Sequence, residues 1–426
     1  MRTRLSILVC ILYSVLCTPG SAQDYARLSE RTIMGTARYI GMGGAMTAIG
    51  GDPAAAHDNM AGLGLYRRSE AMISLDVTHT APRTNVFLPQ ASFVLSLPSV
   101  SEDSKILFHN LLFSYRRLHA YHRNLNTAGT KGASLGALII HADTEWDIPF
   151  CTDPINDEYS LSLRETGSVN EFDFGWAMNI SNQWYVGVGI NVQAYNLSAE
   201  AEYKELFGRR YNTNTTTLLY TGASFSASAG LIYRPTGWLR LGFGIESPSA
   251  GSLTTYSTGT LAAKTDSLRY SYAPDVRESD SHFHMPLHTS TSVAFQIGAY
   301  GMIALQHDYW HISASEPMHS LRAGVEVIPV LGLYLNAGYA YESSFKREDI
   351  SVPMQSTFER QDTYFIRPKG THYASFAVGY RGEKMIVQAA YQYRWNAMNV
   401  YAHENSAADY IHTDTHRVVL TLGWHN

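Results

Sequence analysis

The chain has 426 residues, a formal net charge of −5, 45% hydrophobic residues and 12% aromatic residues. So small a charge on a chain of this length argues against a nucleic-acid partner. The 28 tyrosines, 7 tryptophans and 33 glycines favour a β-protein with aromatic side chains at a membrane interface.

The first 22 residues are predicted to be a cleaved signal peptide. Two arginines precede an apolar run from Leu5 to Cys17, and small residues before Gln23 provide the cleavage site. The run is shorter than the about 20 residues that a membrane-spanning helix requires. Cleavage leaves Cys151 as the single cysteine, so the exported chain is not expected to contain an internal disulfide.

Residues 23–66 have no strand-like alternation and contain many small residues. The glycines are Gly35, Gly41, Gly43, Gly44, Gly50, Gly51, Gly62 and Gly64. The segment is too rich in small residues for a lipid-facing strand and too apolar for a free tail. We expect a compact plug (hatch) inside a barrel lumen, and the alternative is a periplasmic arm packed outside the barrel.

From residue 67 onward, apolar and polar residues alternate with a period of two. Between residues 184 and 193 one row is Trp184, Val186, Val188, Ile190 and Val192, and the other is Tyr185, Gly187, Gly189, Asn191 and Gln193. A soluble β-sandwich also alternates, but its outer face is usually richer in charge. The pattern indicates apolar side chains that face lipid and wettable side chains that face a lumen.

Fourteen segments carry this pattern. They are residues 69–80, 86–97, 104–118, 168–180, 183–198, 216–234, 237–250, 282–297, 300–312, 318–328, 330–343, 371–382, 384–398 and 414–425. Short connections alternate with long ones, the latter at 119–167, 199–215, 251–281, 344–370 and 399–413, as in barrels with tight periplasmic turns and long outer loops. We interpret 251–281 as a kinked extension plus loop. The expected fold of residues 67–426 is an all-β, antiparallel transmembrane barrel of 14 strands in the outer membrane of a Gram-negative bacterium.

The segment before the first strand also resembles a known family. Its glycine-rich run from Gly35 to Ala45 is followed by Gly50-Gly51-Asp52, and the segment ends in the run from Asn59 to Tyr66. These stretches resemble the FadL/TodX family of outer-membrane transporters for hydrophobic compounds. In the Asn-Pro-Ala-Gly-Leu run typical of that family, Asn59, Ala61, Gly62 and Leu63 match, and Met60 replaces the proline.

The resemblance implies a plugged lumen and passive passage of hydrophobic small molecules, such as long-chain fatty acids, with no cofactor. It also implies lateral release near a kinked strand, although the expected third strand, 104–118, contains neither glycine nor proline. The predicted plug motif is Gly41, Gly43, Gly44, Asn59, Ala61 and Gly62. The predicted ligand-contacting residues are Met34, Tyr39, Ile40, Met42, Met46 and Leu63. Expected partners are a hydrophobic molecule or lipid and the lipid and lipopolysaccharide of the membrane.

Three other patterns in the sequence have simpler interpretations than a binding site. His282, His284 and His288 have a spacing that suits a metal or haem, but no carboxylate or cysteine completes the set nearby, so no metal site is expected. The acidic loop at 141–158 matches no dedicated Ca²⁺ cage. The run from Gly41 to Gly44 does not complete a nucleotide-binding fingerprint.

Charged residues on the polar rows are expected to face the lumen. They are Glu171, Asp173, Arg240, Glu246, Arg322, Glu326 and Arg394. They assemble no catalytic pair that the sequence can identify, so no enzyme is predicted. Two alternatives to transport remain: a barrel that docks surface or secretion partners, and a haemin-binding receptor.

Overall fold

A computed structural model describes residues 28–100, 104–136, 151–273, 275–311, 317–344, 363–403 and 405–426. The predicted signal peptide, residues 1–22, lies outside the described residues, as does most of the acidic loop at 141–158. Among the described residues, no helix has both the length and the apolar composition that crossing a bilayer requires.

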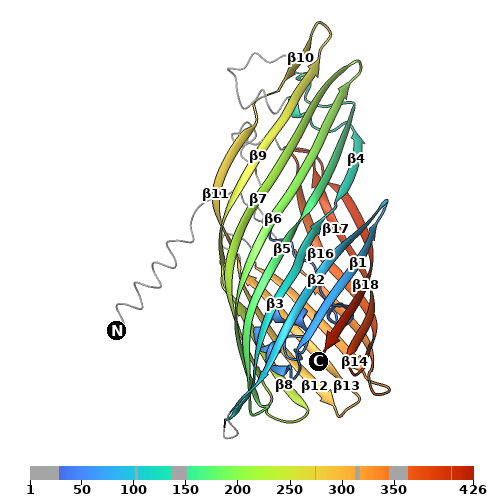
Figure 1. Cartoon of the computed structure of the whole chain (residues 1–426). Coiled ribbons are helices and arrows are strands. Elements are labelled where there is room, and N and C mark those ends of the chain that lie inside the picture. Colours follow the sequence, from blue (N-terminus) through green and yellow to red (C-terminus); the bar gives the residue numbers. More distant parts are fainter. Residues whose placement is uncertain are drawn as a thin grey trace.

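The described chain is one antiparallel sheet closed on itself, with short helical turns at its start (Figure 1). The strands are β1 Glu70–Thr80, β2 Arg83–Pro98, β3 Ile106–Tyr121, β4 Asn124–Thr130, β5 Glu158–Ile180, β6 Trp184–Phe207, β7 Arg210–Tyr233, β8 Leu239–Glu246, β9 Ser249–Lys264, β10 Arg269–Tyr272, β11 Arg277–Met285, β12 Leu287–Ile297, β13 Gly301–His311, β14 Met318–Val327, β15 Leu333–Glu342, β16 Phe365–Arg381, β17 Met385–Tyr401 and β18 Asp409–His425.

The barrel has fourteen strands, as the sequence predicts. Three of them consist of more than one segment, because β3 continues into β4, β8 continues into β9, and β10 and β11 lead into β12. Closure comes from β1, which pairs with both β2 and β18. Glu70 lies opposite His425 in this pairing, so the barrel begins and ends at the same rim.

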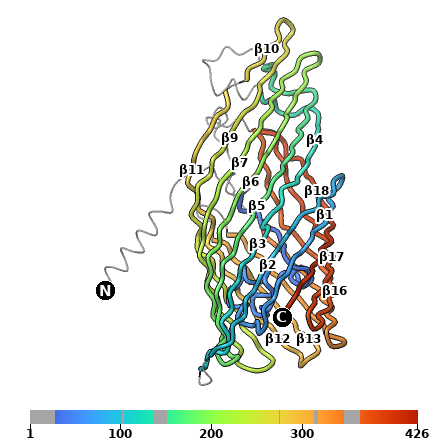
Figure 2. Tube along the Cα trace, in the orientation of Figure 1, coloured from blue at the N-terminus to red at the C-terminus, as the bar shows by residue number. Residues whose placement is uncertain are grey.

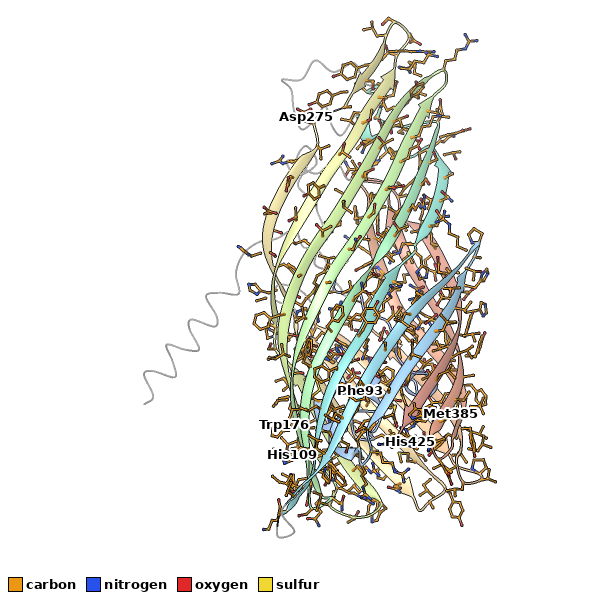
Figure 3. All side chains as sticks on the ribbon, in the orientation of Figure 1. Phe93, His109, Trp176, Asp275, Met385 and His425 are labelled. Atoms are coloured by element: carbon orange, nitrogen blue, oxygen red, sulfur yellow. The ribbon has the colours of Figure 1, made fainter. Side chains whose placement is uncertain are left out.

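The two faces of the wall differ as the alternation predicts. On β6, Val188 and Ile190 are 47% and 54% exposed on the outside, whereas Asn191 and Gln193 are buried inside. Figure 3 shows side chains on both faces, and Phe93 is one of the exposed apolar residues of the outer face. His109 and Trp176 stack with ring centroids 5.9 Å apart at the end of the barrel where His425 lies. Such a surface is that of a transmembrane barrel.

One side of the barrel is much taller than the other. β5, β6 and β7 have 23, 24 and 24 residues, whereas β12 and β13 have 11 each. A tilted strand needs about 9–11 residues to cross a bilayer. The tall strands therefore continue far beyond the lipid-facing belt (Figures 1 and 2).

The predicted loop at 199–215 is wrong for this reason, since β6 and β7 run through it and leave only a tight turn at Gly208. The predicted loop at 119–167 is wrong in part, because it contains the end of β3, all of β4 and the start of β5. Above the lipid belt the outward row of β6 becomes polar, with Asn196, Ser198, Glu200 and Glu202. The inward row, which carries Asn191 and Gln193 lower on the strand, becomes apolar here, with Leu197, Ala199, Ala201 and Tyr203 buried. The strand thus continues beyond the residues whose outward row is apolar. In 251–281 the predicted extension is present as β9, and the rest forms β10 and β11 rather than a simple loop.

The wall is interrupted where β8 passes into β9 and β11 passes into β12. On both strands the alternation of buried residues shifts by one position here. Even-numbered residues are buried up to Glu246 and odd-numbered ones from Ser249, whereas odd-numbered residues are buried up to Met285 and even-numbered ones from His288. Pro248 and Pro286 lie in the two linkers, and a proline cannot donate to a strand ladder. β3, by contrast, has shifts in its pairing with β5 at both ends but contains no proline or glycine.

The N-terminal segment, residues 28–66, lies against the inner face of the wall near the rim that carries the C-terminus (Figure 2). It forms the α-helix α3 (Ala37–Gly41) and the 3-10 helices η1 (Pro53–Ala56) and η2 (Met60–Leu65). Side chains cap all three: Thr36 accepts from Tyr39 N, Asp52 from Ala54 N, and Asn59 from Ala61 N. These caps supply acceptors for amide groups that a helix of one or two turns leaves unpaired.

Candidate functional site

Four arginines of the wall reach inward and hold the N-terminal segment. Arg116, Arg240 and Arg417 donate to the backbone carbonyls of Ala54, Ile49 and Ile33, at 2.7, 3.2 and 2.7 Å. The fourth, Arg322, lies 3.3 Å from Asp58. Buried carbonyls require donors, and these guanidiniums provide them from strands on different sides of the lumen.

A fifth arginine makes the reverse contact, from the segment to the wall. Arg38 of α3 donates from Nε and Nη2 to the two carboxylate oxygens of Glu326 on β14, at 2.6 and 2.9 Å. Asn336 on β15 donates to the same carboxylate at 2.9 Å. A bidentate geometry fixes both the distance and the orientation of the two groups.

The surroundings of Tyr39 and Asp52 in the segment shift their pKa values. Burial raises the pKa of Tyr39, and the carboxylate of Asp58, which accepts from the Tyr39 hydroxyl at 2.6 Å, raises it further. Burial also raises the pKa of Asp52, although the positive charge of Arg38 and the hydroxyl of Thr36 oppose this shift. Both groups belong to a polar network that crosses the interior of the segment.

The predicted motif residues make specific contacts. Asn59 donates to the carbonyls of Thr47 and Leu231, at 2.8 and 3.2 Å, so that it joins η2 both to the preceding turn and to β7. Gly43 and Gly44 have φ values of +62° and +76°, a region that disfavours side chains with a Cβ. A Cβ on Gly41 would lie 2.3 Å from that of Ala377, and Gly62 packs against Gly50, while Ala61 is buried.

Glycines on the inner face of the wall complement the segment. A Cβ added to Gly230 on β7 would lie 1.8 Å from Oδ1 of Asn59, and one added to Gly244 on β8 would lie 1.9 Å from the carbonyl oxygen of Asp58. Gly338 on β15 meets the backbone of Gly43 in the same way. These inward glycines allow the backbone of the segment to touch the backbone of the wall.

The six predicted ligand-contacting residues are buried in the packing of the segment. Tyr39, Ile40, Met42 and Met46 belong to one core cluster, and Leu63 belongs to another. Met34 is 1% exposed. None of the six is among the described residues that line a cavity in the upper lumen, so their contact with a ligand stays a prediction.

That cavity, of about 610 Å³, lies in the upper lumen over the N-terminal segment. The segment contributes Glu30 and Arg31 to its lining, and the wall adds apolar groups such as Tyr121, Leu125 and Met398. Charged groups also face it, including Arg123 and Arg394 and the carboxylates of Glu165 and Glu342. The lining is therefore amphipathic rather than uniformly apolar.

An apolar cluster in the middle of the lumen adjoins the cavity. This mid-lumen cluster consists of Leu28, Leu118, Tyr121, Val169, Tyr195, Leu197, Ala199, Leu218, Tyr220, Leu253, Phe283 and Met285. Tyr121 belongs to both the cluster and the cavity lining. The sequence predicts a lumen lined by wettable side chains and misses this apolar layer, although the inward positions Tyr195, Leu197 and Ala199 of β6 carry the signal for it.

The charged residues predicted to face the lumen do so, and several of them contact the N-terminal segment. The three histidines at 282, 284 and 288 do not meet, because the interruption at Pro286 places His288 inside and leaves His282 exposed. Within the described part of the acidic loop, Asp153 pairs with Arg210 at 3.0 Å and Asp157 accepts from the amide of Gly208.

No protein-family model matches the sequence, and no curated protein matches it. Among solved structures, a Pseudomonas aeruginosa FadL homologue aligns with a TM-score of 0.59 and 10% identity over 93% of this chain and 98% of that chain. The Ralstonia pickettii toluene transporter TbuX aligns with a TM-score of 0.55 and 14% identity over 92% and 98%. The P. putida toluene transporter TodX aligns with a TM-score of 0.52 and 13% identity over 92% and 98%. With this likeness along almost its whole length and an apolar outer face, the chain is an outer-membrane β-barrel with the FadL/TodX fold.

Proposed function

We propose that the protein is a passive outer-membrane channel of the FadL/TodX family for small hydrophobic or amphipathic molecules, such as long-chain fatty acids. The observation that carries the proposal is the mid-lumen cluster beside the cavity. Apolar side chains that face inward, in a barrel that is apolar outside as well, create a place where an apolar molecule leaves water without entering the lipid leaflet.

In this proposal residues 23–66 form the plug. The buried ion pairs and backbone contacts of residues 28–66 support a segment that closes the lower lumen. The cavity lies in the upper lumen, on the side of this segment that faces away from the rim with the C-terminus, next to Glu30 and Arg31. An amphipathic ligand would place its apolar part against Tyr121 and Met398 and its polar end among the charged groups.

The structural relatives named as toluene transporters suggest small aromatic hydrocarbons as a second ligand class. The charged lining favours a molecule with a polar end over a plain hydrocarbon. Binding of radiolabelled oleate and of radiolabelled toluene to the detergent-purified protein separates the two classes.

The variant Leu197→Asn tests the role of the cluster, because it puts an amide among buried apolar groups. We expect oleate to bind roughly tenfold more weakly, a loss of about 1.4 kcal/mol. Its matched control is Ser198→Asn, on the opposite face of the same strand. Equal affinity of the two variants, or no binding by the wild type, would refute the proposal.

The tall strands favour a second candidate function, a docking platform for surface or secretion partners. β6 exposes Glu200, Glu202 and Lys204 on the outer face of the region that continues beyond the lipid belt. Shortening the hairpin around Gly208 would abolish partner capture in this alternative and leave oleate binding unchanged.

A further inference from the structure

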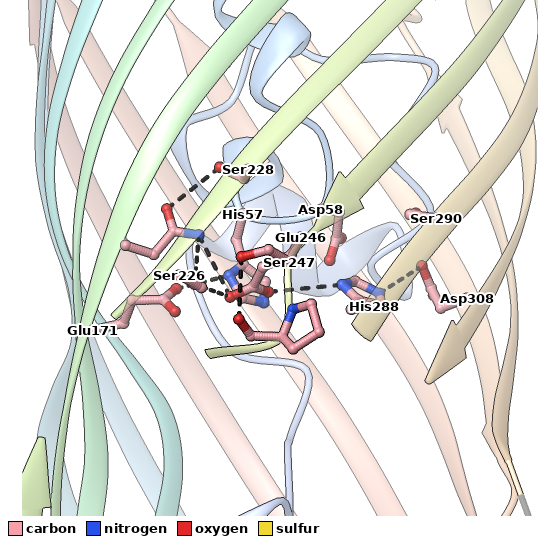
Figure 4. Close-up of polar contacts among 12 residues, drawn as sticks. His57, Asp58, Glu171, Ser226, Ser228, Glu246, Ser247, His288, Ser290 and Asp308 are labelled. Carbon is pink, nitrogen blue, oxygen red and sulfur yellow. Dashed lines mark hydrogen bonds and ion pairs between the residues drawn. The ribbon is translucent and has the colours of Figure 1, made fainter. Parts of the chain in front are cut away.

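A buried cluster of potential metal ligands lies where the N-terminal segment meets the interrupted wall. His57 follows η1, Glu246 ends β8, and His288 lies at the start of β12 (Figure 4). One ligand atom from each residue lies within 4.8 Å of those from the other two. The side chains are 9%, 10% and 4% exposed.

Each histidine has a carboxylate near one of its ring nitrogens. Nδ1 of His57 is 2.7 Å from Oε1 of Glu171, and Nε2 of His288 is 3.6 Å from Oδ1 of Asp308. This leaves the other nitrogen of each ring for a third partner, and Nδ1 of His288 lies 4.0 Å from Oε2 of Glu246. A carboxylate behind the imidazole is the usual support of a metal-bound histidine, because it fixes the tautomer and the orientation of the ring.

Neighbouring side chains also position Glu246 and His288. Oε1 of Glu246 accepts from the hydroxyl of Ser226 at 2.6 Å, which directs Oε2 toward His288 (Figure 4). The ring of His288 stacks on the indole of Trp310, with centroids 4.5 Å apart and an angle of 8° between the planes. The rings of His57 and His288 face each other at 6.1 Å. Neighbouring side chains therefore orient the three ligands toward one another before any ion arrives.

The charges around the cluster favour a cation. Arg322 lies between Asp58 and Asp308, at 3.3 and 3.0 Å, so those two carboxylates share a guanidinium. Glu171 and Asp173 interact with the positive charge of Arg116, and Glu246 adds a third carboxylate on this side. A buried excess of negative charge is costly unless it is paired, and a divalent ion between the imidazoles would pair it.

We propose that His57, Glu246 and His288 bind one divalent transition-metal ion, Zn²⁺ in the first place, and that the ion fastens the N-terminal segment to β8 and β12. Two imidazoles and a carboxylate are a common Zn²⁺ ligand set, with bonds of about 2.0–2.2 Å and a fourth position for water. Such bonds place the ligand atoms about 3.3–3.6 Å apart, so binding would draw Nδ1 of His288 and Oε2 of Glu246, now 4.0 Å apart, about half an ångström closer together. The site is independent of the proposed transport and of His282 and His284.

Zn²⁺ binding to the full-length, detergent-purified protein after chelator dialysis tests the proposal. We expect elemental analysis to find one tightly bound Zn²⁺ per chain. The X-ray absorption spectrum should show nitrogen and oxygen ligands, two of them imidazoles. Co²⁺ should give the intense visible bands of a four-coordinate ion. Zn²⁺ should also raise the apparent melting temperature.

Two variants and one control locate the ion. His57→Ala removes a ligand and should abolish tight binding, whereas Glu171→Gln removes only the support of His57 and should weaken it roughly 10–100-fold. The control is His307→Ala with His319→Ala, which removes an exposed pair of histidines whose ring nitrogens are 3.0 Å apart on the outer face. This control should leave the affinity for Zn²⁺ and the number of ions bound per chain unchanged.

Two results would overturn the proposal. The first is wild-type protein that holds well below one Zn²⁺ per chain at micromolar free metal. The second is binding that the outer-face control abolishes and His57→Ala leaves intact. Because the first result needs no variant, a folding defect in His57→Ala cannot hide a failure.

Discussion

Arg38 and Glu326 form a bidentate ion pair inside the barrel, with Nε–Oε2 and Nη2–Oε1 distances of 2.6 and 2.9 Å. The pair joins the first helix of the N-terminal segment to β14, and the glutamate side chain is only 2% exposed. Its position explains why α3 stays against the wall although it has only five residues. The same contact makes the attachment of the segment measurable.

Glu326→Gln should loosen this attachment, because it leaves the guanidinium of Arg38 without its opposing charge. Breaking a buried pair from one side costs about 3–5 kcal/mol. We expect a lower apparent melting temperature in detergent and faster hydrogen exchange in residues 28–66. The control is Glu383→Gln at an exposed turn.

A double variant distinguishes the ion pair from a general packing defect. Arg38→Gln combined with Glu326→Gln removes both charges, so it should be more stable than Glu326→Gln alone. If the loss of stability in the double variant equals the sum of the losses in the two single variants, the ion pair does not contribute as described.

Gly230→Ala tests the contact between segment and wall. Its Cβ would lie 1.8 Å from Oδ1 of Asn59, so η2 must shift, at a cost of about 1–3 kcal/mol. Protease cleavage within residues 28–66 should become faster. Gly237→Ala is the matched control, because a Cβ there has no neighbour within 4 Å, and equal cleavage rates for the two variants would contradict the contact.

The barrel itself could be predicted from the sequence to a large extent. Strand number, closure and the orientation of rows such as Val188 and Ile190 follow from the alternation, because a lipid-facing row must be apolar whatever its neighbours are. The upper parts of β6 and β7 could not be placed, since above the lipid belt the outer row is as polar as a loop.

The contacts of the interior were harder to predict for a different reason. His57, Glu246 and His288 are far apart in sequence, and His288 faces inward only because the interruption near Pro286 switches the faces of the strand. The pairing of Arg38 with Glu326 likewise depends on barrel closure, which brings residues 288 positions apart into contact. Local patterns identify such residues as inward-facing but do not say which of them meet.

Ile190→Arg tests the position of the lipid belt. Ile190 is 54% exposed on the outer face, and an arginine near the middle of a bilayer costs a barrel about 2–4 kcal/mol. Refolding into liposomes should become less favourable by that amount. Ser198→Arg, higher on the same strand among polar residues, should cost less than about 1 kcal/mol, and equal costs at the two positions would place the belt elsewhere.

The most direct test of the proposed passage is the rate at which oleate enters proteoliposomes that contain the purified protein. Ala120 lines the cavity, and Ala120→Trp should fill it; Ala389→Trp, on the lipid-facing side of β17, is the control. Passage through the lumen predicts uptake well above that of protein-free liposomes for the wild type and the control, and a loss of most of that uptake for Ala120→Trp. Uptake by the wild type no faster than by empty liposomes, or an equal rate for Ala120→Trp and the control, would contradict it.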